Sequence, residues 1–249
     1  VDDRKGRYHC FGCKQSGDIF TFLVEKEGAS FPEAVERLAQ EAGLPMPQFS
    51  EADVKREEVR ASLYDVMEIA AKFFEDELQS ARGAKARGYL ADRQLTAAIQ
   101  KEFRIGYGPD DRSALRSHLA SKNVTVEQMA EAGLVIAGDD IPVAYDRFRD
   151  RVMFPIRNIK GECIGFGGRV LGDDKPKYLN SPETPVFSKG RELYGLFEAR
   201  NALREHGYVL VTEGYMDVVA LAQLGFPNAV ATLGTACTAD HVHKLFRFT

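Results

Sequence analysis

Two carboxylates follow a short apolar segment near the carboxyl end of the sequence. In YVLVTEGYMD (208–217), a predicted strand ends at Glu213, a glycine follows, and Asp217 stands in the first turn of the next predicted helix. In an open α/β sheet, ligands bind beyond the carboxyl ends of the strands, so Glu213 is placed to handle a metal ion or a phosphate. An ordinary strand-to-helix junction has the same appearance, because the helix dipole favours an acidic first turn. The segment by itself leaves both interpretations open.

Three arginines alternate in Arg147-Phe148-Arg149-Asp150-Arg151. Alternate residues of an extended strand lie on one face, so the three guanidinium groups are predicted to line a single face. Arginine donates a planar pair of N–H groups to phosphate oxygens, which favours a nucleic-acid backbone or a triphosphate as the ligand. A solvated edge strand with interleaved acids remains the alternative.

A long polar segment, GDDKPKYLNSPETPVFSKG (172–190), places lysines beside an aromatic residue. Its candidate binding residues are Lys177, Tyr178, Asn180 and Lys189. A lysine next to an aromatic ring offers a phosphate contact and a stacking surface together, as single-strand-binding sites do. A surface loop with scattered lysines is the simpler alternative.

Cys10 and Cys13 have the C-x-x-C spacing at which two thiolates bind one zinc ion. A structural zinc site takes four ligands, and the adjacent His9 points to the opposite face of a strand, so the chain as given is expected to bind zinc weakly or not at all. A redox C-x-x-C would need a βαβ context that is absent here. Cys163 and Cys237 stand alone in apolar surroundings and are expected to be buried and unreactive.

Several blocks of the sequence resemble successive motifs of the bacterial, DnaG-type DNA primases. They are YHCFGCKQSGDIFTFLVEKEGASFPEAVERLA (8–39), YDRFRDRVMFPIRN (145–158), GFGGRVLG (165–172), KYLNSPETPVFSKG (177–190), LYGLFEAR (193–200) and EGYMDVVALAQLGFPNAVATLGTACTADHV (213–242). The likeness is weaker between about 57 and 144. The resemblance implies an α+β fold followed by α/β: a partial zinc ribbon, a mixed helical and β subdomain, and the first βαβα of a Toprim parallel sheet.

The resemblance also implies a function. The parent protein would be a DNA-dependent RNA polymerase, a nucleotidyltransferase that synthesises short RNA primers on single-stranded DNA for replication. Its partners would be a single-stranded DNA template, ribonucleoside triphosphates, the RNA primer and, through a further C-terminal domain, the replicative helicase. Mg²⁺ or Mn²⁺ would be the catalytic cofactor and Zn²⁺ a structural one.

Residue by residue, the resemblance assigns Glu213 and Asp217 to the first acidic motif of the Toprim fold, with Glu213 as a magnesium ligand. Cys10 and Cys13 would be half of the zinc site, whose other two ligands lie upstream in the family. The nucleotide and nucleic-acid contacts would be Arg147, Arg149, Lys177, Tyr178, Asn180, Lys189 and, on a looser alignment, Arg93.

The Toprim fold also uses a second acidic motif, D-x-D, and none follows before Thr249. Two-metal chemistry requires several carboxylates, so the chain as given is expected to be inactive. Two alternatives stay open. Another Toprim enzyme, a nuclease or topoisomerase, would share the Glu213 block but has no reason to carry KYLNSPET or YDRFR. A non-catalytic nucleic-acid-binding module could describe the fragment alone.

Composition narrows the class of protein. The 249 residues, 44% hydrophobic and 28% charged, predict one large or two ordinary globular domains. No run of about 18 apolar residues occurs and residues 1–20 lack a signal-peptide core, so a cytoplasmic protein without a membrane span is expected, as a monomer. The net charge is −4, yet 143–205 holds 12 Lys and Arg against 9 Asp and Glu. Basic charge is concentrated where phosphates would bind.

Periodicity and capping residues predict the elements that must position these groups. We expect a zinc-ribbon part at 1–43, a linker at 44–58, a core subdomain at 59–206 and a Toprim start at 207–249. The predicted strands are 7–11, 105–109, 151–157, 162–171, 208–212 and 229–232. The first belongs to a hairpin with a Cys-bearing knuckle, and 151–157 and 162–171 form another hairpin. The predicted helices are 18–24, 30–43, one from 59 to about 78, 83–92, 97–103, one with a capping box at Thr125 and Gln128 and closed by Gly133, 193–206, 215–224 and 239–247. The alternation after 207 predicts a parallel sheet.

Glycines in two places need an explanation. Gly165, Gly167 and Gly168 fall within a predicted strand, and no G-x-x-x-x-G-K-[ST] pattern follows, so close backbone packing is the preferred interpretation. Gly234 and Thr235, between a strand and a helix, are candidates to present backbone N–H groups to a phosphate. Loop closure alone would also favour a glycine at 234.

Overall fold

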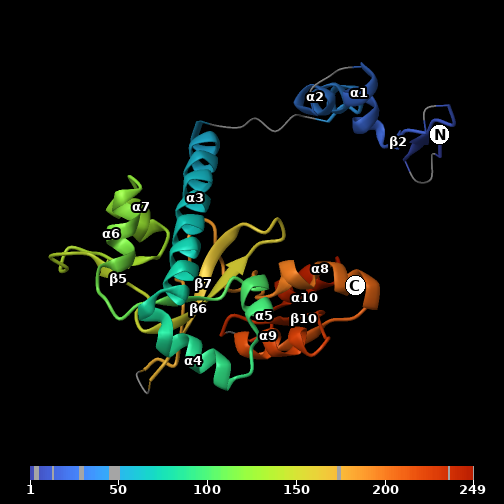
Figure 1. Ribbon diagram of the computed structural model, residues 1–249. Coiled ribbons are helices and arrows are strands. Elements are labelled where there is room, and N and C mark those ends of the chain that lie inside the picture. Colours follow the sequence, from blue (N-terminus) through green and yellow to red (C-terminus); the bar gives the residue numbers. More distant parts are fainter. Residues whose placement is uncertain are drawn as a thin grey trace. The chain divides into compact units, whose positions relative to one another are not determined.

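The computed structural model describes residues 1–2, 6–12, 14–27, 31–44, 51–172, 175–234 and 236–248, without the side chains of residues 32, 51–58, 60 and 61. The chain divides into two compact units, 1–55 and 56–249 (Figure 1). Each unit has its own packing and is treated by itself. Among the described residues, no helix combines the length and the apolar character needed to cross a membrane.

The first unit is a short hairpin followed by two helices. Its elements are β1 (Tyr8–His9), β2 (Ser16–Gly17), α1 (Ile19–Glu27) and α2 (Phe31–Glu41). The carboxylate of Asp18 accepts the N–H of Thr21 at 2.8 Å, which caps the start of α1. The strands β1 and β2 are antiparallel, so the predicted hairpin with a knuckle is present, with a shorter strand than the one expected at 7–11.

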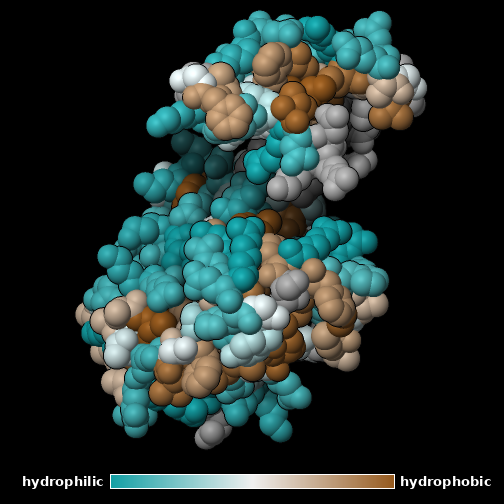
Figure 2. Space-filling model, turned by 90° about the vertical axis from the view of Figure 1, so that its right-hand side faces the viewer, coloured by the Kyte–Doolittle hydropathy of each residue, from teal (hydrophilic) through white to brown (hydrophobic). Residues whose placement is uncertain are grey.

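The first unit has little buried apolar surface. In its described part, Leu23 and Ala34 are the buried hydrophobic residues, whereas Phe11, Phe31 and Leu44 are more than half exposed. Figure 2 shows hydrophobic side chains on the surface of this unit. Units of this size commonly need a metal or a partner for stability.

The second unit contains the remaining elements, except that residues 51–55 of α3 fall in the first unit. They are α3 (Glu51–Gln79), the 3₁₀ helix η1 (Ala81–Gly83), α4 (Ala84–Asp92), α5 (Ala97–Glu102), β3 (Gly106–Gly108), α6 (Ala114–Ser121), α7 (Val126–Glu131), β4 (Val135–Ile136), β5 (Tyr145–Asp146), β6 (Arg151–Arg157), β7 (Cys163–Val170), β8 (Tyr178–Asn180), α8 (Leu196–His206), β9 (Leu210–Thr212), α9 (Tyr215–Gln223), β10 (Ala229–Ala231) and α10 (Ala239–Leu245). The capping box predicted at Thr125 and Gln128 is present, and Gly133 has the left-handed conformation (φ 69°) expected after a helix.

Residues 51–58 of the predicted linker, 44–58, are helical and belong to α3, so the irregular chain expected there is absent. The division between the two units, at residues 55 and 56, falls within the predicted segment. Residues 45–50 lie outside the described part of the chain. The segment EADVKREE lacks an apolar period, and that absence was the basis for expecting a linker. Glu, Ala, Lys and Arg are nevertheless strong helix formers. The helix therefore starts before the apolar period of its sequence does.

The described part of the second unit has three sheets, of which the antiparallel pair β4–β5 is short and the other two organise the core. The larger one has the order β3-β6-β7-β8 and is antiparallel throughout, with β6 and β7 forming the predicted hairpin. The smaller one pairs β9 with β10 in parallel, Leu210 opposite Ala229, as the alternation of strands and helices predicts. Tyr194, ahead of α8, exchanges two backbone hydrogen bonds with Ala231 of β10 at 2.9 and 3.0 Å. Figure 1 shows α8, α9 and α10 gathered around the smaller sheet.

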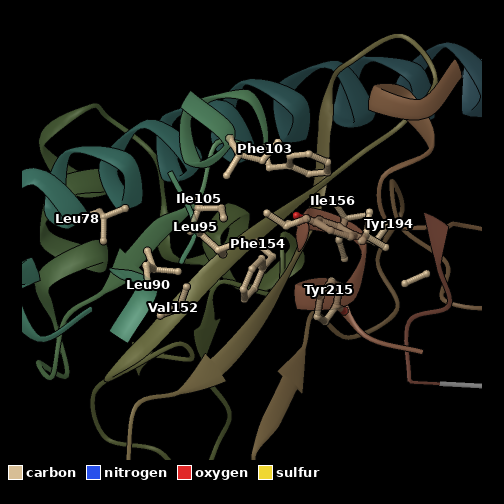
Figure 3. Packing of buried hydrophobic residues seen from close by; sticks show 14 of the residues in the cluster. Leu78, Leu90, Leu95, Phe103, Ile105, Val152, Phe154, Ile156, Tyr194 and Tyr215 are labelled. Carbon is tan, nitrogen blue, oxygen red and sulfur yellow. The ribbon is translucent and has the colours of Figure 1, made fainter. Parts of the chain in front are cut away.

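A single hydrophobic core connects the two sheets. It includes Phe103 after α5, Phe154 of β6, Tyr194 and, from α9, Tyr215 and Val218. The ring of Tyr215 stacks on Phe154 with centroids 5.4 Å apart and meets Tyr194 edge-on at 4.8 Å, as Figure 3 shows. Aromatic pairs of this geometry add to the free energy gained from area burial. The core fixes the position of α9 against the larger sheet.

Candidate functional site

Glu213 lies where the sequence predicts it, directly after β9. It is exposed and lines a hollow of about 500 Å³ together with Thr212, Thr232, Gly234 and Cys237. In the described part of the chain, its carboxylate has no hydrogen-bond or ion-pair partner. A free carboxylate beside hydroxyl groups is suited to a hard divalent cation.

Asp217 lies in the first turn of α9 and is also exposed. A Cβ atom at Gly214 would lie 2.8 Å from Oδ2 of Asp217, so this carboxylate packs over the glycine that joins β9 to α9. No group of three or more His, Cys, Asp or Glu able to hold a metal occurs among the residues that the structure describes. The two acids therefore fit part of a divalent-metal site and supply fewer ligands than a two-metal site needs.

Asn180 joins the cationic segment to the carboxyl end of the smaller sheet. Its Oδ1 accepts the hydroxyl of Tyr215 at 2.7 Å, and its Nδ2 donates to the carbonyl oxygen of Leu233, just after β10, at 2.8 Å. Both ends of the amide are thus used inside the protein. β8, which carries Tyr178 and follows Lys177, is tied by these bonds to the elements that present Glu213.

The glycine-rich strand β7 allows this close approach. A Cβ atom at Gly167 would come within 2.4 Å of the ring of Tyr215, and one at Gly165 within 3.1 Å of the Phe187 ring. The interpretation of these glycines as close-packing residues is therefore confirmed. In the loop between β10 and α10, the proposed phosphate-binding Gly234 has a left-handed φ of 73°, and Thr235 lies outside the described residues.

Gly167→Ala is expected to destabilise the protein by about 1–3 kcal/mol, because the added methyl group must displace the buried Tyr215 ring. The hydroxyl of Tyr215 would then lose its bond to Asn180. Urea unfolding followed by circular dichroism measures the change in stability. Gly172→Ala is the control, since a Cβ atom there meets nothing within 4 Å. Equal stabilities of the two variants would contradict the packing argument.

The prediction that Arg147, Arg149 and Arg151 line one face of a strand is wrong. β5 ends at Asp146 and β6 begins at Arg151, and between them Asp150 has a left-handed φ of 44°, which interrupts any extended segment. The three arginines consequently point to different partners.

Arg151 is buried, with 7% of its surface exposed. Its Nη1 donates to the carbonyl oxygen of Pro176 at 2.9 Å and approaches those of Gly168 and Lys177 at 3.4 and 3.5 Å. It holds the main chain that leads into Lys177 rather than offering its guanidinium group to a ligand.

Arg147 is half-buried. Its Nη2 donates to the carbonyl oxygen of Asn180 at 3.3 Å, and its buried Nε has no hydrogen-bond partner in the described part of the chain. Desolvation lowers the pKa of this guanidinium group. A buried donor without a partner is unusual in native proteins, and an anion would satisfy it.

Arg149 approaches the ring of Tyr145, which lines a different hollow, of about 300 Å³, together with Arg112 and Arg116. The guanidinium carbon of Arg112 lies 4.3 Å and that of Arg149 5.2 Å from the centre of the Tyr145 ring. Arg149 also donates to the carbonyl oxygen of Asp146. Guanidinium groups around an aromatic ring form a surface suited to a nucleic-acid strand.

Arg93 belongs to a cluster with Arg169 and Tyr89, of which the sequence predicted Arg93 alone as a binding residue. Arg93 and Arg169 approach the Tyr89 ring, with guanidinium carbons 5.2 and 4.5 Å from its centre. Arg169 pairs with Tyr178 across β7 and β8. Desolvation raises the pKa of Tyr89, opposed by the two nearby arginines. Arg169 was not predicted from the sequence because Tyr89 lies 80 residues away from it, and GGR (167–169) has no spacing pattern that indicates a binding site.

The two lysines present free side chains. Lys177 is exposed and Lys189 is half-exposed, and in the described part of the chain neither ammonium group has a hydrogen-bond or ion-pair partner. The main chain of Lys189, in contrast, is bonded: its N–H donates to Oε1 of Glu183 at 2.9 Å.

The cysteines divide differently from the expectation. Cys163 is buried, and desolvation raises the pKa of its thiol to about 12, which confirms an unreactive thiol. Cys237 is exposed and lines the Glu213 hollow, so the prediction of burial is wrong there. Cys10 is exposed, and Cys13 lies outside the described residues. The ring of His9 packs edge-on against Phe11 at 4.9 Å.

Three protein families match most of the chain between them. Residues 73–200 match the family described as the N-terminal domain of the DNA primase catalytic core. Residues 1–54 match the CHC2 zinc finger and residues 207–249 the Toprim domain. The first match alone spans more than half of the chain. The chain belongs to the DnaG-type bacterial DNA primase family. The resemblance found in the sequence blocks and the expected fold class are thereby confirmed.

Individual DnaG-type proteins are similar to this chain in sequence and in structure. DNA primase of Pseudomonas aeruginosa is 48% identical over 251 residues, covering 99% of this chain and 38% of that protein. A DnaG primase catalytic domain solved bound to single-stranded DNA is 47% identical, with a TM-score of 0.71, over 78% of this chain and 60% of the other. The zinc-binding and RNA polymerase domains of Aquifex aeolicus primase match with a TM-score of 0.70 and 33% identity, over 100% and 59%. The chain thus spans about two fifths of the length of the curated relative.

Proposed function

We propose that the protein carrying this chain is a DNA primase, which synthesises short RNA primers on single-stranded DNA from ribonucleoside triphosphates. The observation that carries the proposal is the pair of bonds made by Asn180. They bring β8, which carries Tyr178 and follows Lys177, to the same end of the smaller sheet as the exposed Glu213. A carboxylate for a divalent cation and cations for phosphates thus lie on adjoining elements.

The chain's own residues divide the work of binding. Lys177 and Lys189 carry free ammonium groups that would neutralise the charge of a triphosphate. Arg147 would satisfy its buried Nε with a phosphate oxygen, and Arg93 with Arg169 would form a second guanidinium pair beside Tyr178. Holding the triphosphate in one orientation converts binding energy into rate.

The template would pass over the hollow near Arg149. Arg112 and Arg149 flank the Tyr145 ring, so a base can stack while a neighbouring phosphate meets a guanidinium group. This arrangement recognises the backbone and the ring faces rather than base edges. Template binding there would be tolerant of sequence.

Glu213, with Asp217 nearby, would hold Mg²⁺ or Mn²⁺, which supplies charge neutralisation at the phosphate where the RNA chain grows. Zn²⁺ would have a structural role in the first unit, with Cys10 and Cys13 among its ligands, in keeping with the small buried core of that unit. A cytoplasmic, monomeric enzyme that contacts the replicative helicase through another domain completes the proposal.

The test is RNA synthesis by the complete gene product. The purified protein is incubated with single-stranded DNA, Mg²⁺ and the four ribonucleoside triphosphates, and RNA products are resolved by length. Short RNA that depends on the template is expected. Cleavage or relaxation of DNA without RNA synthesis would instead favour a Toprim nuclease or topoisomerase, and DNA binding without any reaction would favour a binding module.

Lys177→Ala is expected to weaken binding of single-stranded DNA and to lower the slope of log K against log salt by about 0.7, because one phosphate contact and its counterion are lost. Fluorescence anisotropy of a labelled oligonucleotide at several salt concentrations measures the slope. Lys160→Ala, at an exposed turn, is the control and should leave the slope unchanged. An unchanged slope for Lys177→Ala would show that Lys177 makes no phosphate contact and is an ordinary solvated surface residue.

A further inference from the structure

His241, in the first turn of α10, is fully buried, with 0% of its surface exposed. Its Nδ1 accepts the N–H of Thr238 at 3.2 Å, while Oγ1 of Thr238 accepts the N–H of His241 at 3.1 Å. The two residues form a capping box at the start of the helix. Glu or Gln usually occupies this position of a capping box, so a buried histidine needs a further explanation.

The second ring nitrogen supplies it. Nε2 of His241 lies 3.1 Å from the carbonyl oxygen of Lys189. Because Nδ1 accepts a hydrogen bond, the neutral ring carries its proton on Nε2, and Nε2 donates to that carbonyl. Lys189 is 52 residues away in the sequence, and capping α10 does not require this bond.

The main chain around Lys189 is fastened to α10 at several points. Oγ1 of Thr238 donates to the carbonyl oxygen of Gly190 at 2.8 Å, and Nζ of Lys244 donates to that of Arg191 at 3.0 Å. On its other side, the N–H of Lys189 is held by Glu183. The peptide groups of this lysine are thus fixed while its ammonium group is left without a partner in the described part of the chain.

The start of α10 also borders the Glu213 hollow. Ala236 and Cys237, immediately before the capping residue Thr238, line that hollow. The bond from His241 to Lys189 therefore connects the loop beside the carboxylate with the segment that carries the lysine. Movement of one would displace the other.

We propose that His241 is a positioning residue: its Nε2–H holds the main chain of Lys189 so that the ammonium group meets the triphosphate beside the Glu213 hollow. This inference rests on the proposed function. His241 itself touches no reacting group. Losing the bond would allow the lysine to retreat and would weaken binding of the nucleotide before and during the reaction alike, which raises KM with little effect on kcat.

Three substitutions of His241 separate its bond to the Lys189 carbonyl oxygen from its role in capping α10. Gln, Glu and Met have similar lengths; Gln and Glu can both accept the Thr238 N–H, but only Gln can also donate to the Lys189 carbonyl. In the complete gene product, with template saturating, His241→Gln should keep the KM for ribonucleoside triphosphates within about twofold of wild type. His241→Glu and His241→Met should raise KM roughly three- to tenfold while kcat changes by less than about twofold. His243→Met, at an exposed position of the same helix, is the matched control and should change neither.

A double-mutant cycle identifies the route. In a Lys189→Ala background, His241→Met should give no further increase in KM, since the group that it positions is gone. Additive increases, or an equal rise for the Gln and Met variants, would overturn the inference. So would a wild-type KM in the Met variant. If the Glu variant does not fold, the comparison of Gln with Met decides. Absence of RNA synthesis by the wild-type protein overturns the proposed function and this inference together, whereas the other outcomes overturn the inference alone.

Discussion

Glu213→Gln is expected to lower RNA synthesis by the complete gene product by about 10³-fold. The amide has the shape of the carboxylate but no charge, and a bound metal's stabilisation of the reacting phosphate is worth several kcal/mol, with about 1.4 kcal/mol for each factor of ten. Because the Glu213 side chain is exposed and has no partner among the described residues, the fold should be unaffected. Product yield at saturating template and nucleotide, together with the unfolding midpoint, measures both effects.

Glu205→Gln is the matched control for this loss. Glu205 is exposed at the end of α8, on a different element, and its replacement should leave RNA synthesis unchanged. Two results would contradict the assignment of Glu213 as a metal ligand. One is RNA synthesis by Glu213→Gln at the wild-type level. The other is a loss of activity accompanied by a lower unfolding midpoint, which would indicate a loss of folded protein.

Glu198→Ala is expected to reduce the free energy of unfolding by about 3–5 kcal/mol. Nε of Arg157 donates to Oε1 of Glu198 at 3.0 Å, and the two side chains are only 11% and 6% exposed. Removing the carboxylate leaves a buried guanidinium charge without compensation, although Nη2 of Arg157 still reaches the carbonyl oxygen of Glu102 at 2.8 Å. Urea unfolding followed by circular dichroism measures the change.

Two comparisons test the cause. The double substitution Arg157→Met with Glu198→Leu removes both charges and should recover most of the lost stability. Asp76→Ala breaks an exposed pair with Lys72 on α3 and should have no measurable effect. A double variant as unstable as Glu198→Ala would show that lost packing, rather than the unpaired charge, causes the effect.

The sequence was sufficient to predict those elements that depend only on residues near one another in the chain. The capping box at Thr125, the β6–β7 hairpin and the parallel β9–β10 pair each follow from patterns within about 20 residues. The exposure of Glu213 follows from the rule that ligands meet the carboxyl ends of parallel strands. Family blocks supplied the rest of the site, including Lys177 and Lys189.

Long-range contacts account for what the sequence could not predict. The alternation of arginines predicted a strand, but β5 ends at Asp146. The carboxylate of Asp146 caps α6, accepting the N–H groups of Leu115 and Arg116 at 2.7 and 2.9 Å. The contacts of Arg169 with Tyr89 and of His241 with Lys189 span 80 and 52 residues, so no local pattern predicts them. The start of α3 was missed because hydrophobic periodicity does not detect a helix turn made of charged residues.

The continuous interior that Phe154 and Tyr194 share with Tyr215 has a practical consequence. The family assignment changes between residues 200 and 207, but the packing does not, so a gene cut at that junction would divide one cooperative folding unit rather than separate two. A fragment that ends at this junction, or a chimera of two homologues joined there, would expose to solvent the aromatic side chains that are buried in the intact chain.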